Sequence, residues 1–208
     1  QFEIILNKVK NTDLYTPVFL AGTMGFRRSE VLGLRWSDIN FETQTMCIQH
    51  TVVKCIKDHK ITLMFSDVPK TRASRRTLPL PSGVLRYLKE LRRRQCDNYT
   101  AHRDKYSREY LKYICVDDMG LIVKPDDLSV GFGRIMAEMN FHCRFHDLRH
   151  TCASLLVQHG VELKSVSIWL GHSSIAVTSD IYTHLTYREK LKVAETIDEY
   201  MKDVNVSP

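Results

Sequence analysis

The sequence predicts a mainly α-helical domain with one small antiparallel β-sheet, an α+β fold. Apolar residues recur every three or four positions over most of the 208-residue chain, a spacing typical of amphipathic helices. Between residues 45 and 80, short runs rich in β-branched residues replace this pattern, and such runs are typical of strands. One domain is the simplest expectation for a chain of this length.

The N-terminal part is expected to supply two helices and the sheet. Residues 13–40 predict two helices separated by a glycine-containing turn, the second over 28–34. Strands are predicted at 46–48, 51–53, 61–63 and 77–80, and Pro81-Ser82-Gly83 ends the sheet. Ser82 is the expected N-cap of a long helix that runs to residue 94, because its hydroxyl can accept a backbone hydrogen bond.

The C-terminal half is expected to be helical after a short hairpin within 113–123. Helices are predicted over 128–139, 148–156, 163–170, from about 174, and over 187–202. Gly160 and Gly171 are expected to end the second and third of these, since glycine readily adopts the left-handed conformation of a helix end. The helix from about 174 contains Tyr182.

Composition sets limits on the class of protein. Hydrophobic content is 43% and charged content 26%, as in ordinary globular domains. No apolar run reaches the roughly 18 residues of a membrane span, and the start of the chain resembles no signal peptide. The missing initiator Met leads us to expect a fragment of a longer protein. Six cysteines without a CxxC pair are expected to be reduced and mostly buried, as in the cytoplasm.

Basic residues gather between positions 54 and 76. The formal net charge is +6, and this segment alone holds seven bases against two acids, an excess of +5. We call these bases the basic stripe: Lys54, Lys57, Lys60, Lys70, Arg72, Arg75 and Arg76. Such a stripe is expected either to face a polyanion or to be a solvated strand edge protected by lysines. Charge alone does not decide between the two.

The strongest local motif is Phe145-His146-Asp147-Leu148-Arg149-His150-Thr151. His146 and Arg149 are three residues apart at a predicted helix start, so their side chains share one face. An arginine beside a titratable histidine at a helix N-terminus predicts an anion site with a proton-transfer group next to it. The planar guanidinium suits phosphate because it can bind two oxygens at once.

Two other interpretations of this motif remain open. His146 and His150 have the spacing of metal ligands on a helix, but Asp147 stands where a zinc protease would have glutamate, and no third ligand is evident. The other interpretation is a capped helix with histidines on its surface.

Three further motifs are weak when taken singly. Gly25 permits a turn before Arg27, with Glu30 three residues later, yet such arginines are more often surface charges. Lys70 lies in a predicted hairpin turn, where most lysines are only exposed. His172 follows a predicted helix end and Tyr182 comes ten residues later, although a helical tyrosine is usually a core residue.

Together, the four motifs resemble those of the tyrosine recombinase family, especially integrases of phages and conjugative transposons. The resemblance runs in order from about Leu14 to Tyr187 and includes non-catalytic stretches such as Glu30-Val31-Leu32-Gly33-Leu34-Arg35-Trp36. It implies that Arg27 is the first catalytic arginine and Glu30 its acidic companion. It further implies catalytic roles for Lys70, His146, Arg149, His172 and the nucleophile Tyr182.

The resemblance implies the recombinase catalytic-domain fold over residues 1–186 and strand exchange at DNA phosphodiesters without metal, ATP or other cofactor. Tyr182 would form a 3′-phosphotyrosine, with His146 as candidate base and Lys70 as proton donor to the leaving oxygen. Arg27, Arg149 and His172 would stabilise the charge that develops on the phosphate. DNA-backbone contacts are expected from Lys54, Lys57, Lys60, Arg72, Arg75 and Arg76.

Residues 187–208 are expected to act apart from the catalytic domain. Leu191, Ala194, Ile197 and Met201 form an apolar stripe on a predicted amphipathic helix. This helix is expected either to pack on its own domain or, by analogy with the family, to dock on a neighbouring subunit. The expected partners are therefore double-stranded DNA and further copies of the chain, as a tetramer in the cytoplasm of a bacterial host, and no membrane.

Three other classes of protein compete with this interpretation. A type IB topoisomerase would use similar phosphotyrosine chemistry, but the His146-Asp147-Leu148-Arg149 motif fits recombinases better. A DNA-binding repressor would need neither Tyr182 nor Lys70. A metallohydrolase would lose its activity in a chelator.

Overall fold

The computed structural model describes residues 1–57, 60–67 and 75–172 of the chain. Lys70, Arg72, Tyr182, the side chain of Lys57 and the two helices predicted beyond residue 173 lie outside the described residues. The helices are α1 (Phe2–Val9), α2 (Tyr15–Met24), α3 (Arg28–Gly33), the 3-10 turn η1 (Trp36–Asp38), α4 (Ser82–Ala101), α5 (Pro125–Glu138), α6 (Asp147–Gln158) and α7 (Leu163–Leu170). The strands are β1 (Ile39–Asn40), β2 (Thr45–Ile48), β3 (Thr51–Lys57), β4 (Lys60–Ser66) and β5 (Arg76–Pro79).

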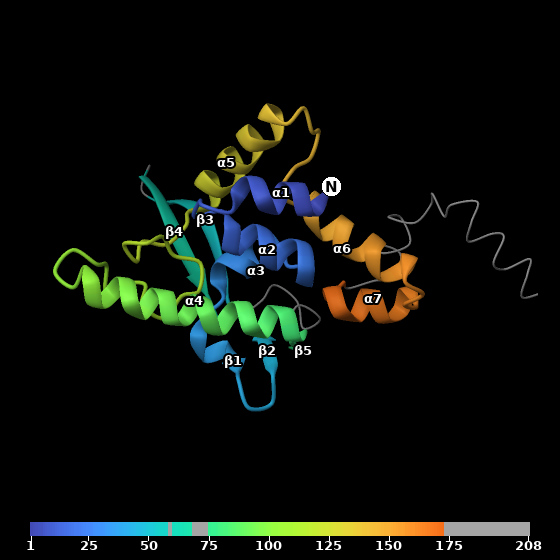
Figure 1. Cartoon of the computed structure of the whole chain (residues 1–208), viewed down its shortest axis with the longest axis horizontal. Helices are drawn as coiled ribbons and strands as arrows, with labels where there is room; N and C mark the ends of the chain where they lie inside the picture. Colours follow the sequence, from blue (N-terminus) through green and yellow to red (C-terminus); the bar gives the residue numbers. More distant parts are fainter. Residues whose placement is uncertain (58–59, 68–74, 173–208) are drawn as a thin grey trace, which may run out of the picture.

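The mainly helical, antiparallel α+β class is confirmed. Figure 1 shows α1, α2 and α3 at the centre, α4 running along one side, and α6 and α7 together at one end. Some elements depart from the sequence prediction. α1 was not expected, and α4 begins after Pro81 as its N-cap, without a side-chain cap from Ser82, and runs on to Ala101 instead of ending at residue 94. The hairpin predicted within 113–123 is reduced to an isolated bridge between Val116 and Ile122. None of the described helices has the length and apolar composition that crossing a membrane requires.

The prediction of a single sheet is wrong. The described strands form two separate sheets, one with the order β1-β2-β5 and one made of β3 and β4, both antiparallel. The chain leaves the first sheet after β2 and passes close to α3, where a side chain on Gly33 would strike the backbone of His50. α3 packs against β3, which pairs with β4, while β2 pairs with the returning β5.

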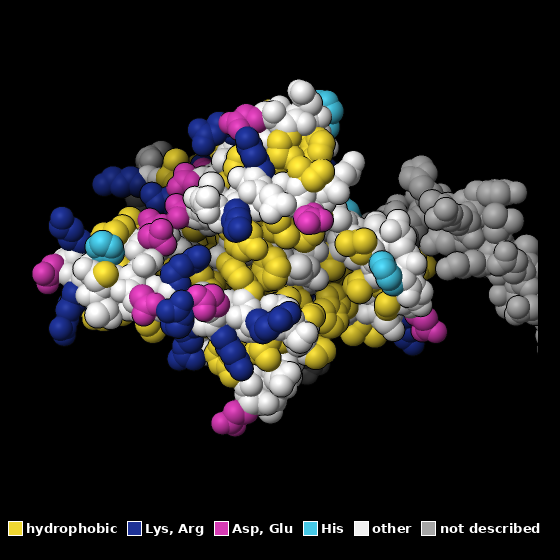
Figure 2. All heavy atoms as spheres, viewed as in Figure 1, with side chains coloured by type: hydrophobic (Ala, Val, Ile, Leu, Met, Phe, Trp, Pro, Cys, Tyr) yellow, Lys and Arg dark blue, Asp and Glu magenta, His cyan; other side chains and the backbone are white. Residues whose placement is uncertain are grey.

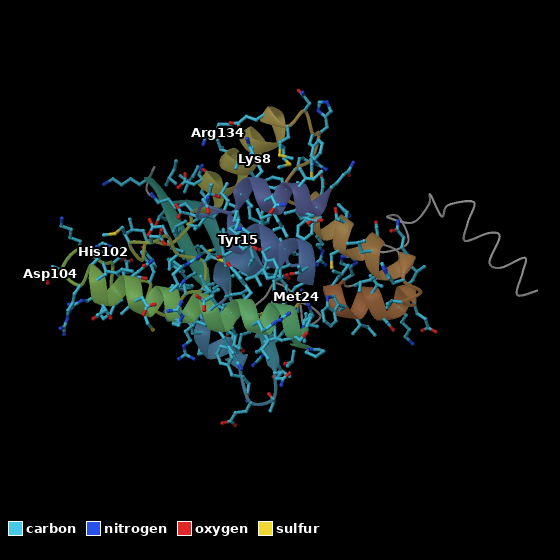
Figure 3. All side chains as sticks on the ribbon, viewed as in Figure 1. Lys8, Tyr15, Met24, His102, Asp104 and Arg134 are labelled. Carbon is cyan, nitrogen blue, oxygen red and sulfur yellow. The ribbon has the colours of Figure 1, made fainter. Side chains whose placement is uncertain are left out.

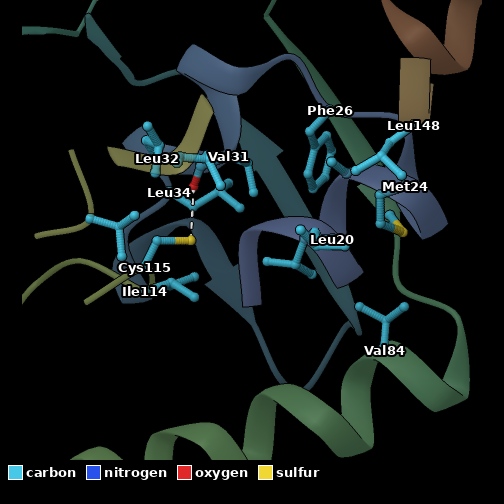
Figure 4. Close-up of a cluster of buried hydrophobic side chains, with 14 of the residues drawn as sticks. Leu20, Met24, Phe26, Val31, Leu32, Leu34, Val84, Ile114, Cys115 and Leu148 are labelled. Atoms are coloured by element: carbon cyan, nitrogen blue, oxygen red, sulfur yellow. Dashed lines mark hydrogen bonds between the residues drawn. The ribbon is translucent and has the colours of Figure 1, made fainter. Parts of the chain in front are cut away.

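The main core surrounds α2, which is buried on most sides. The largest fully buried side chains of this core include Leu20, Met24, Phe26 and Leu32, and Figure 4 shows part of the cluster. Cys115 lies in it and its thiol donates to the carbonyl of Val31 at 3.3 Å. The described cysteines are all free, but only Cys115 and Cys152 are buried, so the expectation of mostly buried thiols is wrong.

A smaller apolar cluster joins α6 to α7. Ala153 of α6 packs with Val166 and Leu170 of α7. α6 also lies against α2, since the thiol of Cys152 donates to the carbonyl of Thr23 at 3.4 Å. Both helices are followed by a glycine with a positive φ, Gly160 and Gly171, which confirms the predicted helix ends. Through these contacts, the starts of α3 and α6 lie close to the end of α7.

Candidate active site

Arg27 stands at the junction of α2 and α3. Gly25 ends α2 in the left-handed conformation, with φ of 72°, and two residues later Arg27 is the N-cap of α3. The carboxylate of Glu30 accepts from the backbone N–H of Arg27 at 2.9 Å and from its guanidinium Nη1 at 2.7 Å. Glu30 therefore caps α3 and holds the Arg27 side chain at the same time.

Arg149 lies in the first turn of α6 and its side chain is 2% exposed. Its Nη1 donates to the carbonyl of Gly25 at 2.6 Å and its Nη2 to the carbonyl of Leu170 at 2.8 Å. Arg27 makes a similar contact, from Nη2 to the carbonyl of Gly171 at 3.0 Å. Both arginines thus bind carbonyls at helix ends, where the aligned peptide dipoles attract cations.

Arg76 completes the group around Glu30. Its Nη1 and Nη2 donate to the two carboxylate oxygens of Glu30, each at 3.2 Å, and its Nε donates to the carbonyl of Trp169 at 2.7 Å. Nη1 of Arg149 lies 4.0 Å from the same carboxylate. Three guanidinium groups therefore face a single carboxylate, which leaves a local excess of positive charge.

The surroundings of Arg76 differ from those expected of a residue in the basic stripe. Its side chain is only 7% exposed and its charge is paired with Glu30. The alternation of the strand could have predicted that Arg76 points inward, because Arg76 and the buried Leu78 alternate with the exposed Thr77 and Pro79. Counting the bases of the segment does not reveal this alternation.

Two histidines border the arginines. Burial, then Arg149, Arg27 and Arg76, lower the pKa of His172 to about 4. Burial, then His150 and Arg149, hold the pKa of His146 below its usual value. The rings of His146 and His150 meet edge to face, with centroids 5.2 Å apart. Both shifts favour the neutral imidazole of His146 and of His172, which can accept a proton and can donate or accept a hydrogen bond.

The pKa values of the buried Glu30 and Arg149 also reflect the excess of positive charge. Burial would raise the pKa of Glu30, but Arg76 and then Arg27 hold it below its usual value. Burial, followed by repulsion from Arg27, lowers the pKa of Arg149 to about 9, so its guanidinium keeps its charge at neutral pH. Arg27 and Arg149 each use two of their five N–H groups in hydrogen bonds among the described residues. The arrangement is suited to a phosphate-like anion.

An open groove of about 560 Å³ continues from Arg27 and His146. Arg28 and Arg144 line it as well, as do Val53 of β3 and Ser129 of α5. In the basic stripe, Lys60 and Arg75 are exposed, and Lys54 is ion-paired with Asp126 of α5. The groove and the stripe both involve β3, so a long anion in the groove would approach the stripe.

The structure brings together four of the six catalytic residues predicted from the sequence, namely Arg27, His146, Arg149 and His172. Lys70 and Tyr182 lie outside the described residues. Sequence analysis missed the burial of Arg76 and the helix-end carbonyls that hold the arginines. Among the described residues, no group of three or more His, Cys, Asp or Glu side chains could hold a metal ion.

Comparisons with known proteins identify a family. The model of the Phage integrase family matches residues 2–189. A tyrosine recombinase XerC-like protein of Caldanaerobacter subterraneus subsp. tengcongensis is 33% identical over 201 residues, which cover 94% of this chain and 51% of the relative. The transposase from transposon Tn916 of Enterococcus faecalis is 24% identical over 179 residues, covering 83% of this chain and 42% of the relative. The chain thus spans about half the length of these curated relatives.

Solved structures show the same fold. The Tn1549 transposon integrase, in complex with transposon right end DNA, matches with a TM-score of 0.73 at 20% identity, over 94% of this chain and 63% of that one. A lambda integrase dimer bound to a COC' core site matches with a TM-score of 0.59 at 15% identity, over 86% of this chain and 45% of that one. With a family model that spans nearly the whole chain and a relative one-third identical over 94% of it, the chain belongs to the phage integrase family, the tyrosine recombinases.

Proposed function

We propose that this chain is the catalytic domain of a site-specific recombinase. It cleaves and rejoins double-stranded DNA, in the integration or excision of a mobile element within the cytoplasm of a bacterial host. The observation that carries the proposal is the convergence of Arg27, Arg149, His146 and His172 around a site with one carboxylate. Named relatives support it, because they include a transposon transposase and integrases solved with DNA.

The site is matched to a phosphodiester undergoing substitution. In the pentacoordinate transition state, negative charge gathers on the non-bridging oxygens, and fixed donors aimed at those oxygens stabilise it. Arg27 and Arg149 are held in place by helix-end carbonyls and still have N–H groups for the phosphate. His172, neutral at physiological pH, can add one further hydrogen bond.

Tyr182 and Lys70 have the two remaining roles in this proposal. The phenolic oxygen of Tyr182 attacks phosphorus, the bond to the 5′-oxygen breaks, and a 3′-phosphotyrosine forms. The phenolic proton passes to His146, and Lys70 gives a proton to the leaving 5′-oxygen. Attack by a 5′-hydroxyl of the partner strand reverses these steps. The phosphodiester energy is kept in the covalent bond, so the reaction consumes no ATP and calls for no metal.

The proposal extends to DNA contacts along the groove and the basic stripe. Lys60, Arg75 and Lys54 lie on or next to the two sheets and can bind backbone phosphates, which supplies affinity without reading the sequence. Lys57 and Arg72 are assigned the same role from the sequence alone.

We further propose that residues 1–186 form the catalytic domain and that the helix predicted in 187–208 joins copies of the chain into a tetramer on DNA. The described surface offers an apolar groove of about 440 Å³ with Phe2, Phe19, Leu155 and Leu156 in its lining. In Figure 2, an apolar area between α2 and α4 reaches toward α6. Its chemistry suits the apolar stripe of Leu191, Ala194, Ile197 and Met201.

Covalent trapping tests the catalytic proposal. The protein is incubated with a labelled DNA duplex nicked near the crossover, so that the cleaved end diffuses away, and a denaturing gel separates the products. We expect a labelled protein band that persists in a chelator and is absent from Tyr182→Phe, which lacks the nucleophilic oxygen. Tyr15→Phe, at a tyrosine of α2, is the matched control and keeps the band. A band that remains in Tyr182→Phe, or its absence from wild-type protein bound to this DNA, would refute the proposal.

A further inference from the structure

Arg76 has contacts that neither the basic stripe nor the catalytic roles explain. It opens strand β5, six residues after Lys70 in the sequence. Its guanidinium spans two parts of the site: Glu30 of α3 on one side and the carbonyl of Trp169, in the last turn of α7, on the other. The guanidinium carbon also lies 5.9 Å from the ring centroid of Phe26, the residue before Arg27.

These contacts place Arg76 behind the residues assigned to the phosphate. Glu30, which Arg76 binds with two N–H groups, in turn holds both the backbone and the guanidinium of Arg27. The third N–H group of Arg76 binds the carbonyl of Trp169. The next two residues of the chain, Leu170 and Gly171, supply the carbonyls that bind Arg149 and Arg27. His172 follows directly. Movement of Arg76 would therefore change the positions of both arginines and of His172 together.

We propose that Arg76 is a positioning residue of the phosphate site, which ties β5, α3 and the end of α7 into one rigid frame. It acts through Glu30 and the Trp169 carbonyl and does not itself bind the DNA. The catalytic part of this inference rests on the proposed function, whereas the anion-binding part does not.

A planar fork is required for this role. Toward described residues, Arg76 directs three N–H groups in two directions from one rigid group, to a carboxylate and to a carbonyl. A lysine ammonium keeps the charge but is a compact donor at the end of a flexible chain, so it cannot hold the same partners in the same geometry. Arg76→Lys thus separates geometry from charge. Arg93→Lys is the matched control, because Arg93 also joins two acidic residues, Glu90 and Asp97, but on the exposed surface of α4.

The first measurement is the binding of inorganic phosphate, followed by NMR of arginine Nε–H groups and of the His172 ring. In the wild-type protein, phosphate should shift the signals of Arg27, Arg149 and His172. In Arg76→Lys we expect the affinity for phosphate to fall about tenfold, since partners that orient binding groups commonly have effects of this size. Arg93→Lys should bind as the wild type does. Equal affinity in folded Arg76→Lys, or a wild-type protein that binds no phosphate here, would overturn the inference.

The second measurement is the rate of covalent-intermediate formation on the nicked DNA. Because misplacement of reacting groups slows the chemical step, the rate at saturating DNA should fall about 10- to 100-fold in Arg76→Lys. The DNA concentration at half saturation should rise by no more than the loss in phosphate affinity, and the salt dependence should stay unchanged. If Arg76 instead bound the DNA backbone, the salt dependence would drop by about one unit, contrary to the inference. If the wild-type protein binds phosphate but forms no intermediate, the proposed function fails and the phosphate result alone decides this inference.

A measurement on the wild-type protein covers the case in which Arg76→Lys does not fold. The Nε–H of Arg76, which donates to the Trp169 carbonyl, should exchange slowly with solvent and shift less on phosphate addition than the Nε–H of Arg27. A shift as large as that of Arg27 would indicate direct contact with the anion and overturn the positioning role.

Discussion

At the scale of the single residue, Glu30 is the charge on which the site depends. It is 3% exposed and is the acidic partner of both Arg27 and Arg76. The site holds more positive than negative charge, and a bound phosphate would neutralise part of this excess. An isolated buried cation costs several kcal/mol, so we expect this one carboxylate to contribute to stability as well as to the proposed catalysis.

Replacement of Glu30 by glutamine should expose this dependence. We expect Glu30→Gln to lose about 3 kcal/mol of unfolding free energy, because it leaves buried guanidinium groups without a counter-charge. Added phosphate should raise the melting temperature of Glu30→Gln more than that of the wild type, since the anion supplies the missing charge. Chemical unfolding and thermal scans measure both effects. Glu90→Gln on the exposed face of α4 should change neither, and equal phosphate stabilisation of both proteins would count against the account.

His172 predicts how stability varies with pH. Its pKa in the folded protein is about 4, whereas an unfolded histidine has a pKa of about 6.5. Between these values the unfolded chain binds more protons, so the free energy of unfolding should fall as pH drops from about 6.5 to about 4. Above that window the contribution is fully present. Urea unfolding across the window measures it, and His172→Gln should show a weaker dependence, part of which remains because His146 is shifted in the same direction.

The sequence predicted the positions of some site residues but not the surroundings of others. The motifs identified Arg27, His146, Arg149 and His172, since their chemistry is distinctive in that order, and the structure brings them together. Arg76 was assigned to a DNA-facing stripe because a count of charges cannot distinguish a paired, buried arginine from an exposed one. Its distant partners, Glu30 and Trp169, are fixed by tertiary packing that the local sequence does not contain.

At the scale of the element, the ends of helices matter more than their faces. The carbonyls that hold Arg27 and Arg149 belong to Gly25, Leu170 and Gly171, at the ends of α2 and α7. The end of α2, marked by Met24 in Figure 3, lies near α7. Helices α2 to α7 could be predicted from apolar periodicity and glycine punctuation. The division into two sheets could not, because local sequence does not specify which strands pair across the fold.

Substitution of Gly25 tests the geometry of the α2 end. Gly25→Ala would adopt a strained positive φ and its methyl group would strike the side chain of Leu170. We expect a loss of about 1–3 kcal/mol in unfolding free energy and weaker phosphate binding, since the Gly25 carbonyl holds Arg149. Gly133→Ala on α5, where the added carbon meets nothing within 4 Å, should instead gain about 0.4–1 kcal/mol. Equal unfolding free energies of the two variants would contradict the prediction.

At the scale of the whole molecule, the basic stripe and the groove define the face proposed for DNA. Each phosphate contact releases bound counterions, so the slope of log affinity against log salt reports the number of contacts. Lys60→Ala should make this slope less steep by about 0.9 on double-stranded DNA of any sequence. Lys8→Ala on α1, where the lysine pairs with Glu138, should leave the slope unchanged. Filter binding over a range of salt concentrations measures both, and equal slopes for Lys60→Ala and the wild type would remove Lys60 from the DNA face.

Trp169 gives the site an optical signal of its own. Its indole N–H donates to the carbonyl of Met24 at 3.1 Å, while its own carbonyl accepts from Arg76. The chain has only one other tryptophan, Trp36, which lies in η1 against Gln95 of α4. In a Trp36→Phe variant, tryptophan fluorescence would therefore come from Trp169, beside the arginine cluster, alone. The binding of DNA and the proposed covalent step would then be distinguishable in time by fluorescence, without any attached dye.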